Sequence, residues 1–152
     1  MYEHIEFKNA INMRKANYDK FPSTKLTGML VQGWDSIISM LKKKMDARKV
    51  LAVDLYTGVY EEEVLDAFSK EFSGKVMNVR DLMKPEKEIQ TLTERFMTED
   101  VLFGYVTNLK LEDYLDADKV AAARKQISEA KETIVIIGTG AAVVAPQDAM
   151  VV

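Results

Sequence analysis

The residues of this chain that could do chemistry stand just after short apolar runs. The first set is Asp54, the one charged residue within the apolar run at residues 50–56, together with Tyr56, Thr57 and Gly58 at the end of that run. In a parallel sheet, ligands bind beyond the carboxyl ends of the strands, where loops and helix amino termini converge. We therefore expect a ligand-binding crevice at that edge and assign no catalytic residue. The other candidates for it are Arg80, Asp81, Gly138, Thr139 and Gly140, with Thr107 and Asn108 after a doubtful strand.

The chemistry closest to the first set is phosphate binding. A phosphate loop, G-x-x-x-x-G-K-[ST], surrounds phosphate with backbone amides, a lysine and a hydroxyl that holds magnesium. The comparable stretch lacks that lysine and hydroxyl and places three carboxylates at the start of the next helix. Like charge at that place repels phosphate. A small-molecule kinase that uses a lysine from another part of the sequence is the least favoured hypothesis. The stretch is Leu55-Tyr56-Thr57-Gly58-Val59-Tyr60-Glu61-Glu62-Glu63.

Gly138-Thr139-Gly140 resembles the start of a dinucleotide fingerprint, but Val143 stands at the third glycine position. The fingerprint also follows the first strand of its unit, which this stretch does not. Plain structural roles therefore stay open for all the loop candidates. Asp81 can be a turn or cap residue, Thr57 a helix cap, and the glycines left-handed turn residues. Tyr56 and Tyr60 could stack on a base or sugar, but half-buried loop positions are the commoner outcome.

This sequence has few residues that could form a metal site or a reactive thiol. Its 152 residues include one histidine, His4, and no cysteine. Disulfides and thiolate metal sites are excluded, and one imidazole near the amino terminus cannot build a zinc cage or a catalytic triad. We expect no cofactor in this chain.

The charge pattern gives no sign of a nucleic-acid or membrane partner. The net charge is −3, and the clearest basic cluster is Lys42, Lys43, Lys44, Arg48 and Lys49, typical of the solvated carboxyl end of a helix. Since no run reaches the length of a membrane span and the first residues lack the order of a secretory signal, we expect a cytoplasmic protein.

Apolar periodicity predicts the elements that hold these residues. The pattern predicts a leader or peripheral segment at residues 1–20 and one α/β domain at residues 21–152. Helical spacing predicts a helix over 34–46, then a strand at 50–56 that is buried on both faces. A second helix carries the apolar stripe Val64, Leu65, Phe68 and Phe72, and a strand follows at 75–80.

The second half of the chain repeats this alternation. A helix opens at Pro85 with Ile89, Leu92 and Phe96 as its core face, and residues 101–107 form a strand or an irregular turn. Asp116 or Asp118 caps a further helix, whose stripe is Val120, Ala123, Ile127 and Ala130. The clearest strand is 133–137, and another apolar run begins at Ala149. The pattern predicts a three-layer α/β fold, a mostly parallel sheet with helices on both faces.

Six stretches of the chain, taken in order, resemble the amino-terminal region of a two-part group of bacterial class I mannose-6-phosphate isomerases. The resemblance covers about residues 18–152. The stretches are Tyr18-Asp19-Lys20-Phe21-Pro22, Gln32-Gly33-Trp34-Asp35, Gly58-Val59-Tyr60-Glu61-Glu62-Glu63-Val64-Leu65, Phe103-Gly104-Tyr105-Val106-Thr107, Leu111-Glu112-Asp113-Tyr114-Leu115 and Gly138-Thr139-Gly140-Ala141-Ala142.

The resemblance implies a fold similar to uridine-kinase-like phosphate-loop proteins, with the loop degenerate at Thr57-Gly58. In that group a cupin region, which has no counterpart here, interconverts mannose 6-phosphate and fructose 6-phosphate with zinc. The implied function in carbohydrate metabolism is a non-catalytic regulatory or scaffold domain whose partner is the isomerase domain of a longer parent chain. The apolar run at the last residues agrees with a longer parent.

Two other functions stay open. The crevice could hold a small phosphorylated ligand, a sugar phosphate or a nucleotide, with Arg80 or amides near Gly138 and Gly140 replacing the lost lysine. Alternatively, the chain could serve as an oligomerisation module and form a homo-oligomer.

Overall fold

The structure is a computed structural model, and it describes residues 18–25, 27–45, 49–146 and 148–152. The chain divides into two compact units, Met1–Leu30 and Val31–Val152. The described part of the first unit forms no helix or strand, and most of the predicted leader lies outside the described residues. All the helices and strands that follow belong to the second unit.

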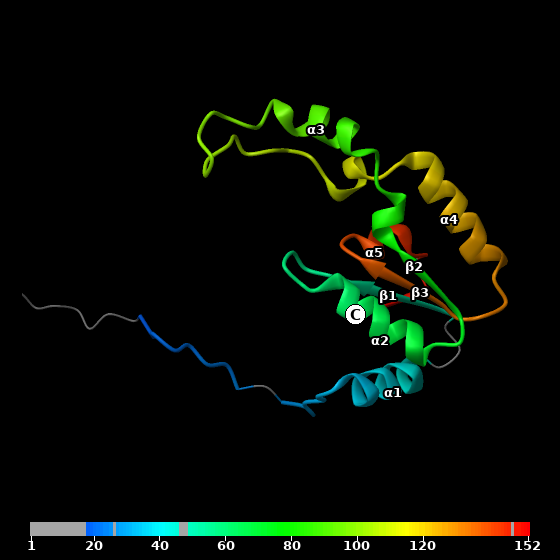
Figure 1. Ribbon diagram of the computed structural model, residues 1–152. Coiled ribbons are helices and arrows are strands. Elements are labelled where there is room, and N and C mark those ends of the chain that lie inside the picture. Colours follow the sequence, from blue (N-terminus) through cyan, green and yellow to red (C-terminus); the bar gives the residue numbers. More distant parts are fainter. Residues whose placement is uncertain (1–17, 26, 46–48, 147) are drawn as a thin grey trace, which may run out of the picture. The chain divides into compact units, whose positions relative to one another are not determined.

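Four parallel strands form the central sheet, in the order β2-β3-β1-β4 (Figure 1). Their bounds are β1 Val50–Asp54, β2 Lys75–Asn78, β3 Ile134–Gly138 and β4 Met150–Val151. The register pairs Val50 with Ile134 and Asp54 with Gly138, so β1 and β3 end level with each other. The sequence prediction of a parallel α/β sheet is confirmed.

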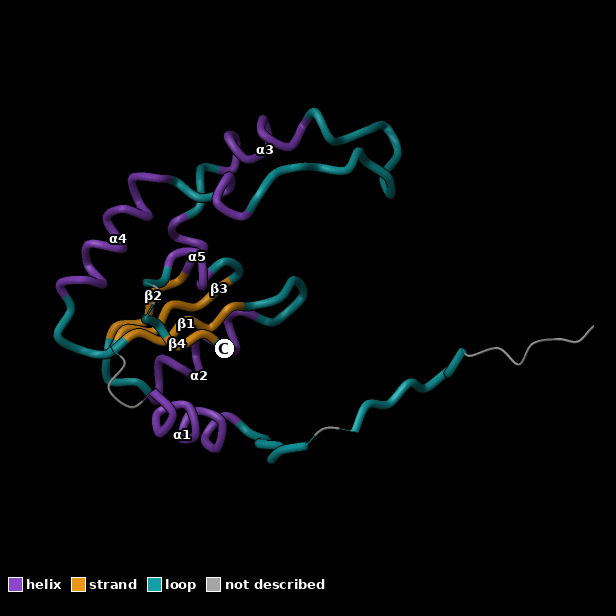
Figure 2. The backbone as a smooth tube through the Cα atoms, turned by 180° about the vertical axis from the view of Figure 1, so that it is seen from behind, coloured by secondary structure: helices purple, strands orange, loops and turns teal. Residues whose placement is uncertain are grey.

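Helices cover both faces of the sheet because successive strand residues point to opposite sides. On one face, α1 (Trp34–Met45) and α2 (Glu61–Glu71) pack on β1 and β3 (Figure 2). Phe68 of α2, at the centre of this layer, meets Phe72 in a stacked contact and Trp34 edge-on. The buried residues of this layer are Ile38, Leu41, Met45, Leu51, Val53, Val64, Phe68, Phe72, Val135 and Ile137.

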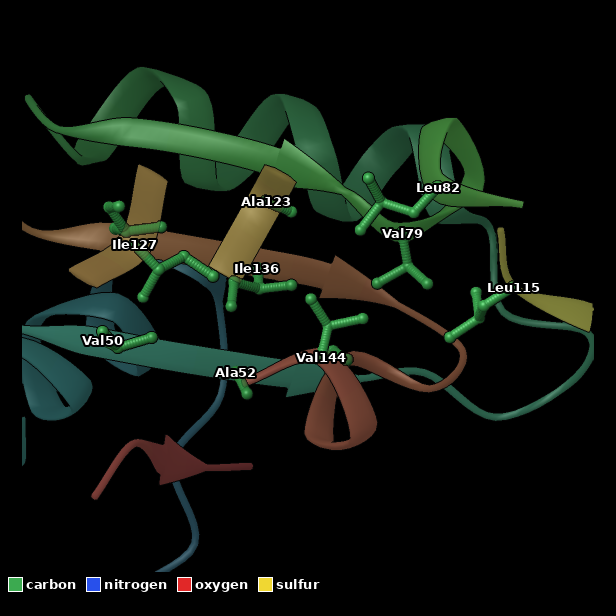
Figure 3. Packing of buried hydrophobic residues seen from close by; sticks show 11 residues of the cluster. Val50, Ala52, Val79, Leu82, Leu115, Ala123, Ile127, Ile136 and Val144 are labelled. Carbon is green, nitrogen blue, oxygen red and sulfur yellow. The ribbon is translucent and has the colours of Figure 1, made fainter. Parts of the chain in front are cut away.

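The opposite face of the sheet packs against α4 (Ala117–Glu129), α5 (Ala141–Val144) and the 3-10 helix η1 (Val79–Leu82). Figure 3 shows the apolar side chains of this layer meeting over β1 and β3. They include Val50, Ala52, Val79, Leu82, Leu115, Ala123, Ile127, Ile136 and Val144. With both faces covered, the two central strands β1 and β3 are apolar except for Asp54 at the end of β1, as the sequence indicated.

Two predicted strands end earlier than expected, and one open alternative is decided. The strand predicted at 75–80 ends at Asn78, because the Asn78 side chain accepts a hydrogen bond from the Arg80 amide and starts η1. The strand predicted at 50–56 ends at Asp54, and the chain turns where the Val59 amide donates to the Tyr56 carbonyl. Residues 101–107 form no strand, so the irregular alternative holds.

The helix predicted at Pro85 exists as α3 (Glu86–Glu94), but its expected core face is wrong. Ile89, Leu92 and Phe96 are only half-buried, and none belongs to either apolar layer. On the face of the sheet covered by α4 and α5, residues of η1 and Leu115 belong to the apolar layer instead. Within the described residues, no helix is long and apolar enough to cross a membrane.

Candidate functional site

The carboxyl ends of β1 and β3 form the point where the chain's connections diverge. The chain leaves β1 for α2 on one face and leaves β3 for α5 on the other. In open α/β sheets a crevice for ligands lies at such a switch point. The predicted residues Asp54, Thr57, Gly58, Thr139 and Gly140 all come to this edge.

Asp54 is the last residue of β1, and its carboxylate binds the start of α5. Its Oδ1 accepts a hydrogen bond from the Gly140 amide at 3.0 Å, and its Oδ2 accepts one from the Ala142 amide at 2.9 Å. A carboxylate is favoured there because the first amides of a helix lack partners within the helix. The place that could attract an external anion thus already holds a negative charge of the chain itself.

A second tie joins the loops after the two strands. The Thr139 hydroxyl donates to the Leu55 carbonyl at 2.9 Å, and the Leu55 amide donates to the Gly138 carbonyl at 3.3 Å. Gly138 has φ +134°, and a Cβ built on it would lie 2.9 Å from Val79 Cβ. The close approach of β3 to η1 therefore requires glycine.

Carboxylates also stand at the start of α2. Glu61 accepts a hydrogen bond from Asn78 Nδ2 at 2.6 Å, and Glu63 accepts one from Trp34 Nε1 at 3.1 Å. The residue before the helix is Tyr60, whose side chain caps nothing, so the suggested capping role of Thr57 is wrong. Negative charge occupies the end of α2 where a phosphate loop would hold phosphate.

The aromatic side chains of the loop after β1 are more exposed than expected. Tyr56 is 85% exposed and Tyr60 is 82% exposed, so the half-buried placement predicted for them is wrong. The turn between them uses Gly58, with φ +94°, which confirms its left-handed conformation. Gly140 is left-handed as well, at φ +87°.

The remaining predicted residues are less closely joined to this edge. Arg80 and Asp81 lie in η1 with exposed side chains, and within the described residues neither side chain makes a hydrogen bond or ion pair. Thr107 and Asn108 follow no strand, so their placement at the sheet edge is wrong. Thr107 instead accepts a hydrogen bond from the Leu109 amide at 3.0 Å within its own loop.

One family accounts for most of this chain. The family model described as a domain of unknown function, DUF8485, matches residues 33–152. The chain belongs to the DUF8485 family. No curated protein and no solved structure matches it. The DUF8485 region begins one residue before α1 and contains every residue of the switch point.

At the switch point of the DUF8485 region, carboxylates accept hydrogen bonds from other groups of the chain. Among the described residues, no three His, Cys, Asp or Glu side chains come together as a metal site would require. Its carboxylates accept hydrogen bonds from backbone amides, an asparagine and a tryptophan. This arrangement positions loops and helix ends. The sequence of residues 55–63 contains no lysine that could bind phosphate there.

A cavity of about 910 Å³ lies at the other end of the strands. Its walls include Lys49 and Val50 at the start of β1 and Arg124 of α4. The Arg124 guanidinium is already engaged, since its Nη2 donates to the Val143 carbonyl at 2.7 Å. Positions 46–48 and 147, which flank the cavity walls in sequence, are outside the described residues.

Sequence reasoning missed the bond between Asp54 and α5. Gly140 and Ala142, whose amides Asp54 binds, lie 86 and 88 positions after Asp54, so no local sequence pattern indicates this contact. The one available signal was an acidic residue closing an otherwise apolar strand, level with a glycine-rich turn in the neighbouring strand. From the sequence alone the same signal predicts a ligand-binding residue, whereas the Asp54 carboxylate binds the chain itself.

Proposed function

We propose that this chain is a non-catalytic regulatory or scaffold domain of a mannose-6-phosphate isomerase. It has a kinase-like α/β fold whose phosphate loop has lost its catalytic residues. Its partner is the isomerase domain of the parent protein, which interconverts mannose 6-phosphate and fructose 6-phosphate. The parent assignment rests on the six-stretch resemblance.

The observation that carries the non-catalytic part is the occupation of the switch point by carboxylates of the chain. Asp54 takes the Gly140 and Ala142 amides, and three glutamates open α2. A transferring phosphoryl group needs positive charge and free donors around it. This edge supplies the opposite charge, which favours a structural role over phosphate transfer.

Zinc belongs to the isomerase reaction, but the residues of this chain do not fit it. His4 stands alone in the sequence, and the described residues contain no cluster of ligands for a metal ion. Zinc proteins hold the ion with three or four such ligands. We therefore place the zinc site in the cupin domain of the parent protein, and this chain takes no part in zinc binding.

The proposal is tested by activity assays on the purified 152-residue chain. We expect no interconversion of mannose 6-phosphate and fructose 6-phosphate in a coupled assay, and no phosphate transfer from ATP with magnesium. Turnover in either assay, lost in Asp54→Ala or Asp81→Ala, would overturn the non-catalytic assignment.

The parent assignment has its own test. We expect the reading frame that encodes this chain to continue into a cupin with histidine and acidic zinc ligands. Deleting residues 1–152 from that parent should leave zinc-dependent turnover but alter its kcat/KM or its thermal stability. A reading frame without a cupin, or a deletion that changes neither quantity, refutes the assignment.

The alternative of a small phosphorylated ligand now depends on Arg80. Its exposed guanidinium lies beyond the carboxyl end of β2, whereas the Gly140 amide is taken by Asp54. Binding of millimolar mannose 6-phosphate, fructose 6-phosphate, ATP or UTP would raise the melting temperature. A rise that disappears in Arg80→Ala, but not in the exposed control Lys87→Ala, would favour this alternative over the scaffold role.

A further inference from the structure

A 29-residue segment between β2 and β3 forms an arm that projects from a closed neck. We define the arm as residues 85–113. At the neck, Met83 and Leu115 pair in an antiparallel bridge, and the Lys84 amide donates to the Tyr114 carbonyl at 3.0 Å. The Lys84 ammonium also donates to the Asp113 carbonyl at 2.6 Å. The arm therefore leaves and re-enters the domain at one fixed point.

The arm contributes nothing to the apolar core. None of its 29 residues is buried, including those of α3. A segment that buries so little must keep its order by local hydrogen bonds or by contact with another molecule. Figure 1 shows α3 and the return segment that together make up the arm.

Local hydrogen bonds stabilise the conformation of the tip of the arm. Asp100 Oδ1 accepts from the Leu102 amide at 2.8 Å and from the Phe103 amide at 3.2 Å. The Tyr105 amide donates to the Phe96 carbonyl at 2.8 Å and ties the tip to the end of α3. Gly104 permits this approach, because a Cβ there would lie 2.5 Å from the Phe96 carbonyl oxygen.

The ordered tip presents apolar side chains to the outside. Val101 and Val106 are each 97% exposed, and Phe103 is 72% exposed. Aromatic and aliphatic groups held rigidly on a surface are typical anchors of protein interfaces, since little conformational freedom is lost on binding. The full set of exposed apolar residues at the tip is Met97, Val101, Leu102, Phe103, Tyr105 and Val106.

Charge indicates which partner fits this surface. The arm carries seven acidic and three basic side chains, a net charge of −4. Two arms packed on each other would bring like charges together, and an anionic membrane or nucleic acid would repel the arm. A second copy of α1 offers lysines, but its exposed side chains are polar and would not cover the apolar tip.

We propose that the arm is a docking surface for a partner protein whose contact face is apolar at its centre and rimmed by lysine or arginine. The apolar centre of the partner covers residues 97–106. Its basic rim meets the acidic residues of the arm, of which Glu94, Glu99 and Asp100 stand beside or within the tip in the sequence. The proposal rests on the protein-binding role given above but not on the identity of the parent protein.

Two synthetic amphipathic helices test this chemistry on the intact chain, one of leucine and lysine and one of leucine and glutamate. Fluorescence anisotropy should give a Kd at least tenfold lower for the leucine–lysine peptide, rising with salt. Phe103→Ser with Val106→Ser should weaken that binding at least tenfold. The control Tyr56→Ser removes another exposed aromatic side chain, from the loop after β1, and should leave the Kd unchanged.

Further outcomes decide against the proposal. Equal affinity for the two peptides, or an affinity that the tip variant does not alter, overturns it. Light scattering that finds a dimer broken by Phe103→Ser would assign the surface to a second copy. Binding to phosphatidylcholine vesicles that the same variant abolishes would assign it to a membrane.

A second variant separates loss of docking from loss of fold. Gly104→Ala keeps every apolar side chain but displaces the tip from Phe96, so it should weaken peptide binding while circular dichroism stays unchanged. The enzyme assays distinguish this proposal from the proposed function. Turnover by the chain would refute the non-catalytic role even with arm binding intact, and failure of arm binding leaves the assays unaffected.

Discussion

At the scale of single residues, Asp54 determines what the end of the sheet can do. Its carboxylate joins β1 to α5 through two amides. An aspartate here with free carboxylate oxygens would be a candidate metal ligand or general base. With both oxygens hydrogen-bonded to backbone amides, the Asp54 side chain instead stabilises the fold. The difference lies in the partners of the two oxygens, which only the folded chain brings together.

Asp54→Ala should lower the free energy of unfolding by about 1 to 2 kcal/mol, because the first amides of α5 lose their acceptor. Urea denaturation followed by circular dichroism measures the change. Asp81→Ala is the matched control, since the exposed Asp81 side chain makes no hydrogen bond among the described residues. An equal decrease in the free energy of unfolding in both variants would contradict a stabilising role for Asp54.

Comparing substitutions at two glycines distinguishes the cost of backbone strain from the cost of a steric clash. Gly138 and Gly58 both have positive φ, but only Gly138 faces a neighbour, Val79. Gly58→Ala should cost about 1 kcal/mol for its backbone conformation alone. Gly138→Ala adds a clash inside the core and should cost at least about 2 kcal/mol more. Urea midpoints of the two variants give the comparison, and similar midpoints would contradict it.

At the scale of elements, α4 shows how far a local pattern determines a helix. Asp116 caps it, with Oδ1 accepting from the Asp118 amide at 3.0 Å and the Lys119 amide at 3.1 Å. The sequence left Asp116 and Asp118 as equal candidates, and the structure selects the first. The stripe through Ala123 and Ile127 is buried, as predicted.

Asp116→Ala should therefore destabilise the chain by about 1 kcal/mol, the usual effect of a lost helix cap. Asp118→Ala removes only a carboxylate from the first turn and should cost a few tenths of a kcal/mol. Thermal melts of the two variants provide the measurement. A larger loss in Asp118→Ala would mean that the helix begins elsewhere.

Elements with a clear apolar period were predictable, and those shaped by tertiary partners were not. The stripes of α1, α2 and α4 and the apolar runs of β1 and β3 placed these elements correctly. η1 was missed because Asn78 begins it with a side-chain hydrogen bond inside the stretch predicted as a strand, residues 75–80. The stripe of α3 suggested burial, but the stripe alone carries no information on which neighbour is available to cover it.

At the scale of the whole Val31–Val152 unit, the parallel sheet and the location of the switch point followed from general rules of α/β topology. Those rules led the sequence to place Asp54, Thr139 and Gly140 at one edge, and the structure brings them there. The rules do not say whether such an edge is open or already bonded. That outcome depends on contacts between residues more than 80 positions apart, for which one sequence holds no local signal.

The strand order also has a consequence for how the chain is made. β1 and β2 are synthesised first, yet they do not pair with each other, and both pair with β3. While residues 50–133 leave the ribosome, neither early strand has a hydrogen-bonding neighbour in the sheet. Pairing across such sequence distances is slow and leaves apolar strand edges exposed. We therefore expect a nascent chain of this protein to expose apolar strand edges until Ile134–Gly138 has emerged.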